Sequence, residues 1–242
     1  MEEWDKKAST ILKFARQLTA ILATQVEAPT IALRLSLLSA QIADECGFED
    51  LAYDFYVQAF TVYEDSINES RAQLQAITLI IGSLGNTKVF SIADYETLVT
   101  KAALHGARLL KKSHQAGAVG LASHLWWQDA SSLADAEPPK EVEEKVKQGG
   151  GDEGAIKAYP HRDSKRVLEC LQKSLRIATS AIEEIVTVQL YCDALDQYLY
   201  YMDRGAPAVC RLMSQLRSSF SYSVSGGPKI RQQFGGTYYI QH

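Results

Sequence analysis

The side chains that could do chemistry in this chain of 242 residues are few and far apart. Asp193 and Asp196 lie three residues apart, so a helix would bring their carboxylates onto one face. Such a pair can transfer protons or bind a cation, although a polar helix surface explains the spacing as well. No two histidines have the spacing that would place both imidazoles on one helix face; they are His105, His114, His124, His161 and His242. A metal site would have to be assembled from several helices, and we expect none.

The sequence also lacks the short motifs that mark common catalytic and nucleotide-binding loops. It contains no GxGxxG, no GxxxxGK[ST], no HExxH and no GxSxG pattern. We therefore expect a protein that is not an enzyme and binds no cofactor. The enzymatic alternative is an all-helical active site that combines His124 with Asp193 and Asp196. A deep pocket joining these three residues would distinguish that alternative.

Composition and charge narrow the class of protein further. The chain carries 25 Lys and Arg against 29 Asp and Glu, a formal net charge of −4, and 46% of its residues are hydrophobic. This balance is typical of a globular protein and argues against nucleic acid or an anionic lipid surface as the main ligand. The N-terminal residues lack a secretory signal, which favours a cytoplasmic protein. The cysteines fall within helical patterns and are predicted to be buried free thiols; they are Cys46, Cys170, Cys192 and Cys210.

Apolar residues recur at helical spacing through most of the chain, and no segment favours a strand. The spacing predicts helices over residues 4–22, 29–46, 50–64, 70–84, 91–112, 115–128, 164–177 and 185–204, another opening at Pro207, and a short last segment after Pro228. Residues 129–160 contain two consecutive prolines, a charged run and three consecutive glycines, which predicts a weakly ordered surface loop. We therefore divide the chain into helix hairpins at 1–128, a flexible charged loop at 129–162 and a helical continuation at 163–242.

Residues at the ends of these segments predict where several helices begin and end. Pro29 suits the first turn of a helix, whereas Gly47 and Gly205 suit the end of one. The runs Ser70-Arg71-Ala72-Gln73 and, more weakly, Ser91-Ile92-Ala93-Asp94 are typical of the capping box that opens a helix. These signals predict short connections between consecutive helices.

The predicted helices pair into hairpins that recur about every 40 residues, the range of HEAT- and armadillo-like arrays. Consecutive antiparallel hairpins that stack on their neighbours form an α-solenoid. The pattern therefore predicts an all-α protein. Periodicity alone leaves both the solenoid and a compact helical bundle open.

Aromatic side chains are concentrated on two helices and in one dipeptide. Tyr56 and Phe60 belong to a cluster on the helix at 50–64, and a second cluster of tyrosines lies near residue 200. Core packing and a partly exposed surface that binds a protein partner both remain open for these clusters. Trp126 and Trp127 are adjacent, and adjacent side chains on a helix diverge by about 100°. We therefore do not expect both indoles in the same core.

Charged residues are concentrated at the ends of two predicted helices. Glu64 and Asp65 lie at the end of the helix at 50–64, where the helix dipole disfavours carboxylates. Arg108, Lys111 and Lys112 lie at the end of the helix at 91–112, where the dipole favours cations. The cations are explained by the dipole and by solubility. The carboxylates suggest a second reason, such as a basic patch on another molecule.

Five runs of sequence, taken in order, resemble a known family. They are Gln58–Asp65, Ala72–Gly82, Leu109–Lys112, Ser123–Trp127 and Arg166–Leu171. Together they resemble the C-terminal part of the large scaffold subunit of retromer, vacuolar protein sorting protein number thirty-five. The resemblance covers essentially the whole chain and is weakest at 129–160 and 221–242. It implies a HEAT-like α-solenoid of stacked antiparallel helix hairpins that is a non-enzymatic part of a longer subunit.

The resemblance also implies partners and a place in the cell. The concave face would bind the small retromer subunit, vacuolar protein sorting protein number twenty-nine, which has a metallophosphoesterase-like fold. The scaffold would form a homodimer at the apex of arch-shaped coats that retrieve cargo from endosomes to the Golgi or plasma membrane. It would lie on the cytoplasmic side of the endosomal membrane and reach it only through coat adaptors. A generic helical adaptor outside retromer is the alternative.

The resemblance can be carried to a few residues. His124 matches a family histidine that points toward the metal pocket of the small subunit. For the same contact we add Trp126, Trp127, Tyr56 and Phe60 from the aromatic clusters. The charged residues match acidic and basic clusters at the scaffold–scaffold contact; they are Glu64, Asp65, Arg108, Lys111 and Lys112. The third acidic position of the family falls on Ser66, so the acidic patch is weaker here.

Overall fold

A computed structural model describes residues 2–128 and 161–215 of the chain, and within these ranges it is almost entirely helical. The helices are α1 (Glu2–Thr24), α2 (Pro29–Glu45), α3 (Glu49–Ser66), α4 (Ser70–Gly85), α5 (Ile92–Ala107), α6 (Lys112–Ala122), the 3-10 helix η1 (Ser123–Trp126), α8 (Ser164–Ala178) and α9 (Glu184–Asp203). Residues 207–215 are also helical. The short segment predicted after Pro228 lies outside the described residues.

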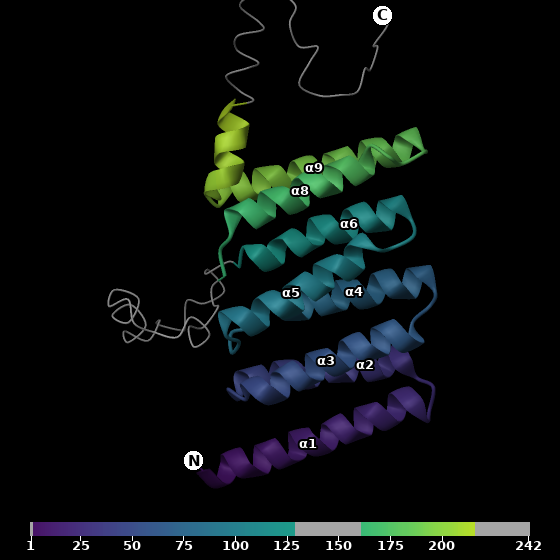
Figure 1. The fold of residues 1–242 in the computed structure, drawn as a ribbon, viewed down its shortest axis with the longest axis vertical. Helices are drawn as coiled ribbons and strands as arrows, with labels where there is room; N and C mark the ends of the chain where they lie inside the picture. Colours follow the sequence, from purple (N-terminus) through teal and green to yellow (C-terminus); the bar gives the residue numbers. More distant parts are fainter. Residues whose placement is uncertain (1, 129–160, 216–242) are drawn as a thin grey trace, which may run out of the picture.

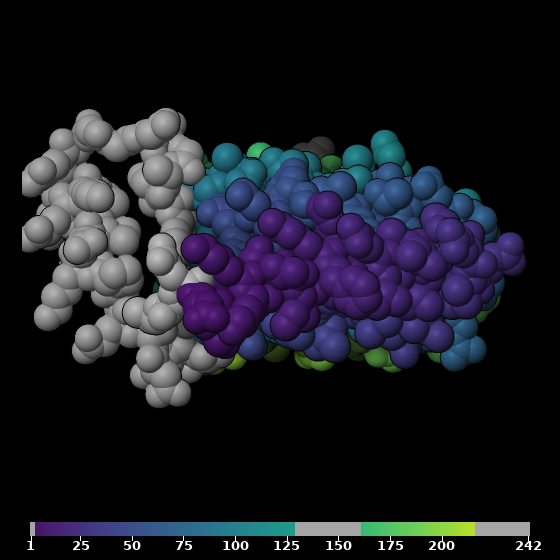
Figure 2. All heavy atoms as spheres, turned by 90° about the horizontal axis from the view of Figure 1, so that it is seen from below, coloured from purple at the N-terminus to yellow at the C-terminus, as the bar shows by residue number. Residues whose placement is uncertain are grey.

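The helices stack in two layers, in the order in which they occur in the sequence (Figure 1). One layer contains α2, α4, α6 and α9, and the other contains α1, α3, α5 and α8. Each helix packs mainly against its neighbours along the chain, and α2, α4, α6 and α9 also pack against one another in turn. Figure 2 shows α1 covering the N-terminal end of this stack. This arrangement confirms the predicted α-solenoid in preference to a compact bundle.

The core lies between the two layers and is joined across hairpins by buried tyrosines. The hydroxyl of Tyr56 lies 2.7 Å from the Oγ atom of Ser83, and the hydroxyl of Tyr95 donates to the carbonyl oxygen of Leu125 at 2.9 Å. Because a buried hydroxyl without a partner is costly, these bonds fix how one hairpin sits on the next. Burial raises the pKa of both phenols, which therefore stay neutral.

Local signals in the sequence set several helix ends as predicted. Pro29 opens α2, and Gly47 and Gly205 follow helices with φ angles of 77° and 72°, a region that favours glycine. The Oγ atom of Ser91 accepts from the backbone amide of Asp94 and donates to its carboxylate, so Ser91 caps α5 as predicted. The return bond of the capping box is not made to Asp94, because the backbone amide of Ser91 donates to Glu49.

The capping box predicted at Ser70 is wrong. The residue that caps α4 is Glu69, whose carboxylate accepts hydrogen bonds from the amides of Arg71 and Ala72. The side chain of Gln73 donates instead to the carbonyl oxygen of Ile67. A glutamate at this position is long enough to reach the free amides, so the helix starts one residue earlier than the box implies.

The predicted helix at 91–112 is also wrong at its carboxyl end. α5 ends at Ala107, and Lys111 is the N-cap of α6, which begins at Lys112. The two lysines therefore lie at the start of a helix, where the dipole disfavours cations. The turn forms because Leu109 is buried and because Gln115 donates its side-chain amide to the carbonyl oxygen of Ala107.

The expectation that the two adjacent indoles would diverge is wrong as well. Trp126 and Trp127 are only 5% and 8% exposed and belong to one core. They are not neighbours on an α-helix, because Trp126 ends η1 and Trp127 adopts an extended conformation that pairs with Arg162.

The two described ranges meet at a short antiparallel contact. The amide of Gln128 donates to the carbonyl oxygen of His161 at 2.8 Å, and the amide of Asp163 donates to that of Trp126 at 2.7 Å. The predicted loop at 129–160 lies between these ends and outside the described residues.

Two further features of the described residues bear on the sequence predictions. The cysteines are free thiols, but Cys192 is exposed and the other three are only partly buried, so the prediction of buried thiols is wrong. Among the described helices, none is long and apolar enough to cross a membrane.

Candidate protein-binding surface

A large hollow lies on the layer formed by α2, α4, α6 and α9. It has a volume of about 860 Å³, and residues from α2, α4, η1 and α9 line it. Its acidic side contains Asp44 and Glu45, and its far side contains His124 and Tyr200. Because the hollow opens on a helical surface, a protruding part of another protein can enter it.

His124 is the one histidine among the described residues that line this hollow. Its imidazole packs against the rings of Tyr200 and Tyr201, with centroids 5.0 Å and 5.4 Å away. Burial lowers the pKa of His124, and the nearby charge of Arg204 lowers it further, whereas a hydrogen bond with Gln197 raises it. The imidazole is therefore neutral near pH 7, and a neutral imidazole nitrogen can accept a hydrogen bond or bind a metal ion.

The α4–α5 connection forms one wall of the hollow and is held by carboxylates of α2 and α3. The Asp44 carboxylate accepts hydrogen bonds from the amides of Lys88 and Val89 at 2.8 Å and 2.9 Å. Glu49 accepts from the amide of Ser91 at 2.6 Å. Burial raises the pKa of Asp44 even though both amides stabilise its charged form. The sequence contained no signal for this role, because each carboxylate binds amides more than 40 residues away.

Gln128 organises the floor of the same hollow. Its side-chain amide donates to the carbonyl oxygens of Gly85 and Thr87 at 3.2 Å and 3.3 Å, and its side-chain oxygen accepts from the amide of His161. Gln128 is 4% exposed, so these bonds satisfy a buried polar side chain. Helical spacing placed Gln128 only at the end of a helix and gave no sign of this role.

The five predicted contact residues do not lie together on the surface. His124 and Trp127 line the hollow, whereas Tyr56 and Phe60 are fully buried between the layers and Trp126 packs in the core. Tyr56 and Phe60 therefore pack in the core, which is one of the two alternatives that the sequence left open for the aromatic cluster of α3. Among the predicted residues, only His124 and Trp127 could touch a partner in this hollow.

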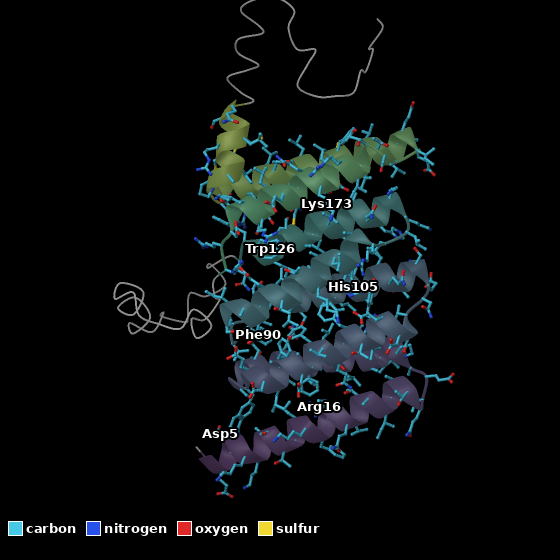
Figure 3. All side chains as sticks on the ribbon, viewed as in Figure 1. Asp5, Arg16, Phe90, His105, Trp126 and Lys173 are labelled. Carbon is cyan, nitrogen blue, oxygen red and sulfur yellow. The ribbon has the colours of Figure 1, made fainter. Side chains whose placement is uncertain are left out.

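Glu64, one of the predicted self-association residues, already has partners within the chain. Its Oε1 atom lies 2.9 Å from the Nζ atom of Lys101 and 2.9 Å from the Nε2 atom of His105, both on α5 (Figure 3). The hydrogen bond with Lys101 is the main reason that the pKa of Glu64 is lowered. This contact explains a carboxylate that opposes the dipole of α3, and Asp65 beside it remains exposed.

The basic residues surround the turn between α5 and α6. Arg108, Lys111 and Lys112 are exposed there, and Leu110 between them is 82% exposed. The Nζ atom of Lys112 donates to the side-chain oxygen of Gln115 at 3.2 Å. The turn therefore presents an exposed leucine flanked by cations.

The residues of the enzymatic alternative lie apart. His124 lines the large hollow, whereas Asp193 lines a separate hollow between α6, α8 and α9 and accepts a hydrogen bond from Gln189. Asp196 is exposed on α9. In the described ranges, no three His, Cys, Asp or Glu side chains are grouped so that they could hold a metal ion. No single pocket thus unites the three residues of that alternative.

Comparisons with known proteins match one family over most of the chain. Residues 1–216 match the protein family described as "Vacuolar protein sorting-associated protein 35". A protein of that name from Schizosaccharomyces pombe is 36% identical over 207 residues, which cover 86% of this chain and 22% of the relative. Vacuolar protein sorting-associated protein 35A from Arabidopsis thaliana is 35% identical over 210 residues, covering 84% of this chain and 23% of the relative. The chain thus spans less than a quarter of the length of these relatives.

Proposed function

Because the chain belongs to the vacuolar protein sorting-associated protein 35 family, we propose that it acts as a non-enzymatic scaffold segment of retromer in endosomal protein sorting. The two-layered helical stack supports this proposal, since α-solenoids present long surfaces to protein partners. On this proposal the segment contributes to retrieval of cargo to the Golgi or plasma membrane. It reaches the endosomal membrane from the cytoplasmic side, through adaptor proteins.

The small retromer subunit binds, on this proposal, across the layer of α2, α4, α6 and α9. The observation that carries this step is the half-buried, neutral imidazole of His124 at the side of a hollow of about 860 Å³. A neutral imidazole can enter a metal pocket of a phosphoesterase-like protein without bringing a repelling charge. The hydrogen bonds of Asp44 and Gln128 hold the surrounding wall and floor in place before the partner arrives.

Binding of the purified small subunit, measured by calorimetry, tests this contact. His124→Ala should weaken binding by about 1–3 kcal/mol, the range for a buried polar contact at an interface. Gln172→Ala is the matched control, because Gln172 is exposed on α8 in the other layer and should leave the affinity unchanged. Equal affinity of the His124→Ala variant and the original chain would contradict the proposed position.

Self-association is the second part of the proposal. The α5–α6 turn supports it, because Leu110 is exposed between Arg108 and the lysines and would be covered by a second copy. Asp65 of that copy offers an exposed carboxylate to these cations, whereas Glu64 is shared with Lys101 and His105. The contact is expected to weaken as salt rises, because exposed ion pairs are screened.

Sedimentation at low and high salt tests self-association. Changing Arg108, Lys111 and Lys112 together to Glu should abolish a salt-sensitive dimer.

A triple variant of α8 serves as the control for net charge. Changing the exposed Lys165, Lys173 and Arg176 to Glu alters the charge equally but leaves the α5–α6 turn intact, so this variant should still dimerise. If all three proteins sediment alike at low salt, this part of the proposal is wrong.

A further inference from the structure

α9 has a row of apolar side chains, here called the α9 stripe, that no described element covers. The stripe residues follow one another at alternating spacings of three and four; they are Ile185, Val188, Cys192, Leu195, Leu199 and Met202. All six are exposed, from 87% at Ile185 to 42% at Met202. The opposite side of α9 packs into the core through Ala194, Tyr198 and Tyr201.

The spacing of the stripe indicates what kind of surface it is. A repeat of three and four residues is the seam along which one helix packs against another chain segment. Single exposed apolar residues need no explanation, but a continuous row along a helix of 20 residues marks a contact surface. In Figure 1, α8 and α9 lie together at the end of the stack, which leaves room for one side of α9 to be exposed.

The chain itself continues from a point beside this stripe. The amide of Ala206 donates to the carbonyl oxygen of Tyr201, and the thiol of Cys210 contacts the carbonyl oxygen of Met202 at 3.7 Å. Val209, Leu212 and Met213 pack against the core from the helical segment at 207–215. The described chain therefore ends next to the carboxyl end of the stripe.

The remaining 27 residues, 216–242, are long enough to cover the whole stripe. From Ile185 to Met202 the stripe is about 26 Å long at 1.5 Å per helical residue. An extended chain of the same 27 residues would reach about 90 Å. The apolar spacing of the 207–215 helix also continues into this segment, at Leu216 and Phe220.

Charge favours the same pairing. α9 contains four carboxylates and no Lys or Arg; the carboxylates are Glu184, Asp193, Asp196 and Asp203. Residues 216–242 contain no Asp or Glu but have three cations, Arg217, Lys229 and Arg231, and five aromatic residues. The segment thus combines the cations and the apolar side chains that an acidic apolar stripe would bind.

We propose that residues 216–242 bind along the α9 stripe. The segment fits the stripe by its position, length, charge and apolar composition. The proposal does not depend on binding of the small subunit, because the stripe and the large hollow are formed by different residues.

Cys192 provides a built-in reporter, because its exposed thiol lies in the middle of the stripe. Its alkylation rate is measured by mass spectrometry in the 242-residue chain, with the partly buried Cys46 on α2 as the internal reference. If the segment covers the stripe, Cys192 reacts at least about fivefold more slowly than in a variant with Phe220→Ser and Phe234→Ser. The rate at Cys46 stays the same in both proteins. Equal rates at Cys192 would overturn the proposal.

A charge variant makes the test independent of the aromatic residues. Arg217→Glu, Lys229→Glu and Arg231→Glu together should expose Cys192, whereas Arg217→Lys, Lys229→Arg and Arg231→Lys should keep it protected. Protection that increases with protein concentration would show that a second copy covers the stripe, and this result would also overturn the proposal.

Discussion

Tyr201 and Ser123 share a buried hydrogen bond of 2.8 Å, although they lie 78 residues apart in the sequence. The bond joins α9 to η1, the short helix that carries His124. Because Tyr201 is fully buried, no water can replace Ser123 as the hydrogen-bond partner of its hydroxyl. The position of the candidate binding histidine therefore depends on a helix from the other described range.

The first prediction concerns this bond. Tyr201→Phe should lower the free energy of unfolding by about 1 kcal/mol, since it leaves Ser123 with only its bond to the carbonyl oxygen of Gly120. Ser123→Ala should cost a similar amount. In a double-mutant cycle measured by urea denaturation, the combined variant should cost less than the sum, because both changes remove one bond. Strict additivity would show that the two hydroxyls do not interact.

A second prediction concerns the crossing of α5 and α6. A Cβ atom on Gly106 would lie only 3.2 Å from the Cβ atom of Ala118, so Gly106→Ala must push the two helices apart. We expect a loss of about 1–3 kcal/mol in the free energy of unfolding. Gly117→Ala on the same pair of helices is the control, because nothing lies within 4 Å of its new Cβ atom and a helical alanine stabilises by about 0.5–1 kcal/mol. Opposite signs in thermal denaturation would confirm the close crossing.

The third prediction separates Glu69 from Ser70 as the cap of α4. Glu69→Ala removes the acceptor for the amides of Arg71 and Ala72 and should cost about 1 kcal/mol. Ser70→Ala should cost much less, because the Oγ atom of Ser70 makes no hydrogen bond. Denaturant titration of the two variants would reverse this order if Ser70 were the cap.

The fourth prediction concerns pH. Burial lowers the pKa of His105, His124 and His161 below the ordinary value of 6.5. The unfolded chain therefore binds more protons than the folded chain just below pH 6.5. The stability that comes from keeping these rings neutral is present above that value and is lost as the pH falls through the folded-state pKa values.

The free energy of unfolding should thus decrease as the pH falls from about 7 to about 5.5. The shifts of Asp44, which is raised, and Glu64, which is lowered, act in the more acidic range of carboxyl groups. Titration of the imidazole C2 protons by NMR checks the cause directly. A midpoint above 6.5 for any of the three rings would contradict the prediction for that ring.

Local signals let the sequence predict most of the helices. Pro29 and Gly47 act through their own backbone angles, so their effect does not depend on distant residues. The same is true of Ser91 and Asp94, whose capping bonds span three residues. Such helix ends can be predicted from the sequence, because the residues that set them lie within one helical turn of each other.

The errors arose where distant contacts decided the local structure. Helical spacing continues past Ala107, but the burial of Leu109 and the bond from Gln115 end the helix there. Trp127 leaves the helical path because Arg162, 35 residues later, pairs with its backbone. Periodicity holds no information on such partners, and it also gave no sign that Asp44 and Gln128 shape the large hollow.

The contact between Trp127 and Arg162 has a consequence for the 32 residues that separate 128 from 161. Two backbone hydrogen bonds hold the ends of that connection within reach of each other, as at the base of a hairpin. The entropy of closing a loop grows slowly once its ends are fixed, by about 0.6 kcal/mol for each doubling of length. Insertions and deletions between these ends therefore cost the helical stack little, so this connection can change in length and sequence independently of the array that carries it.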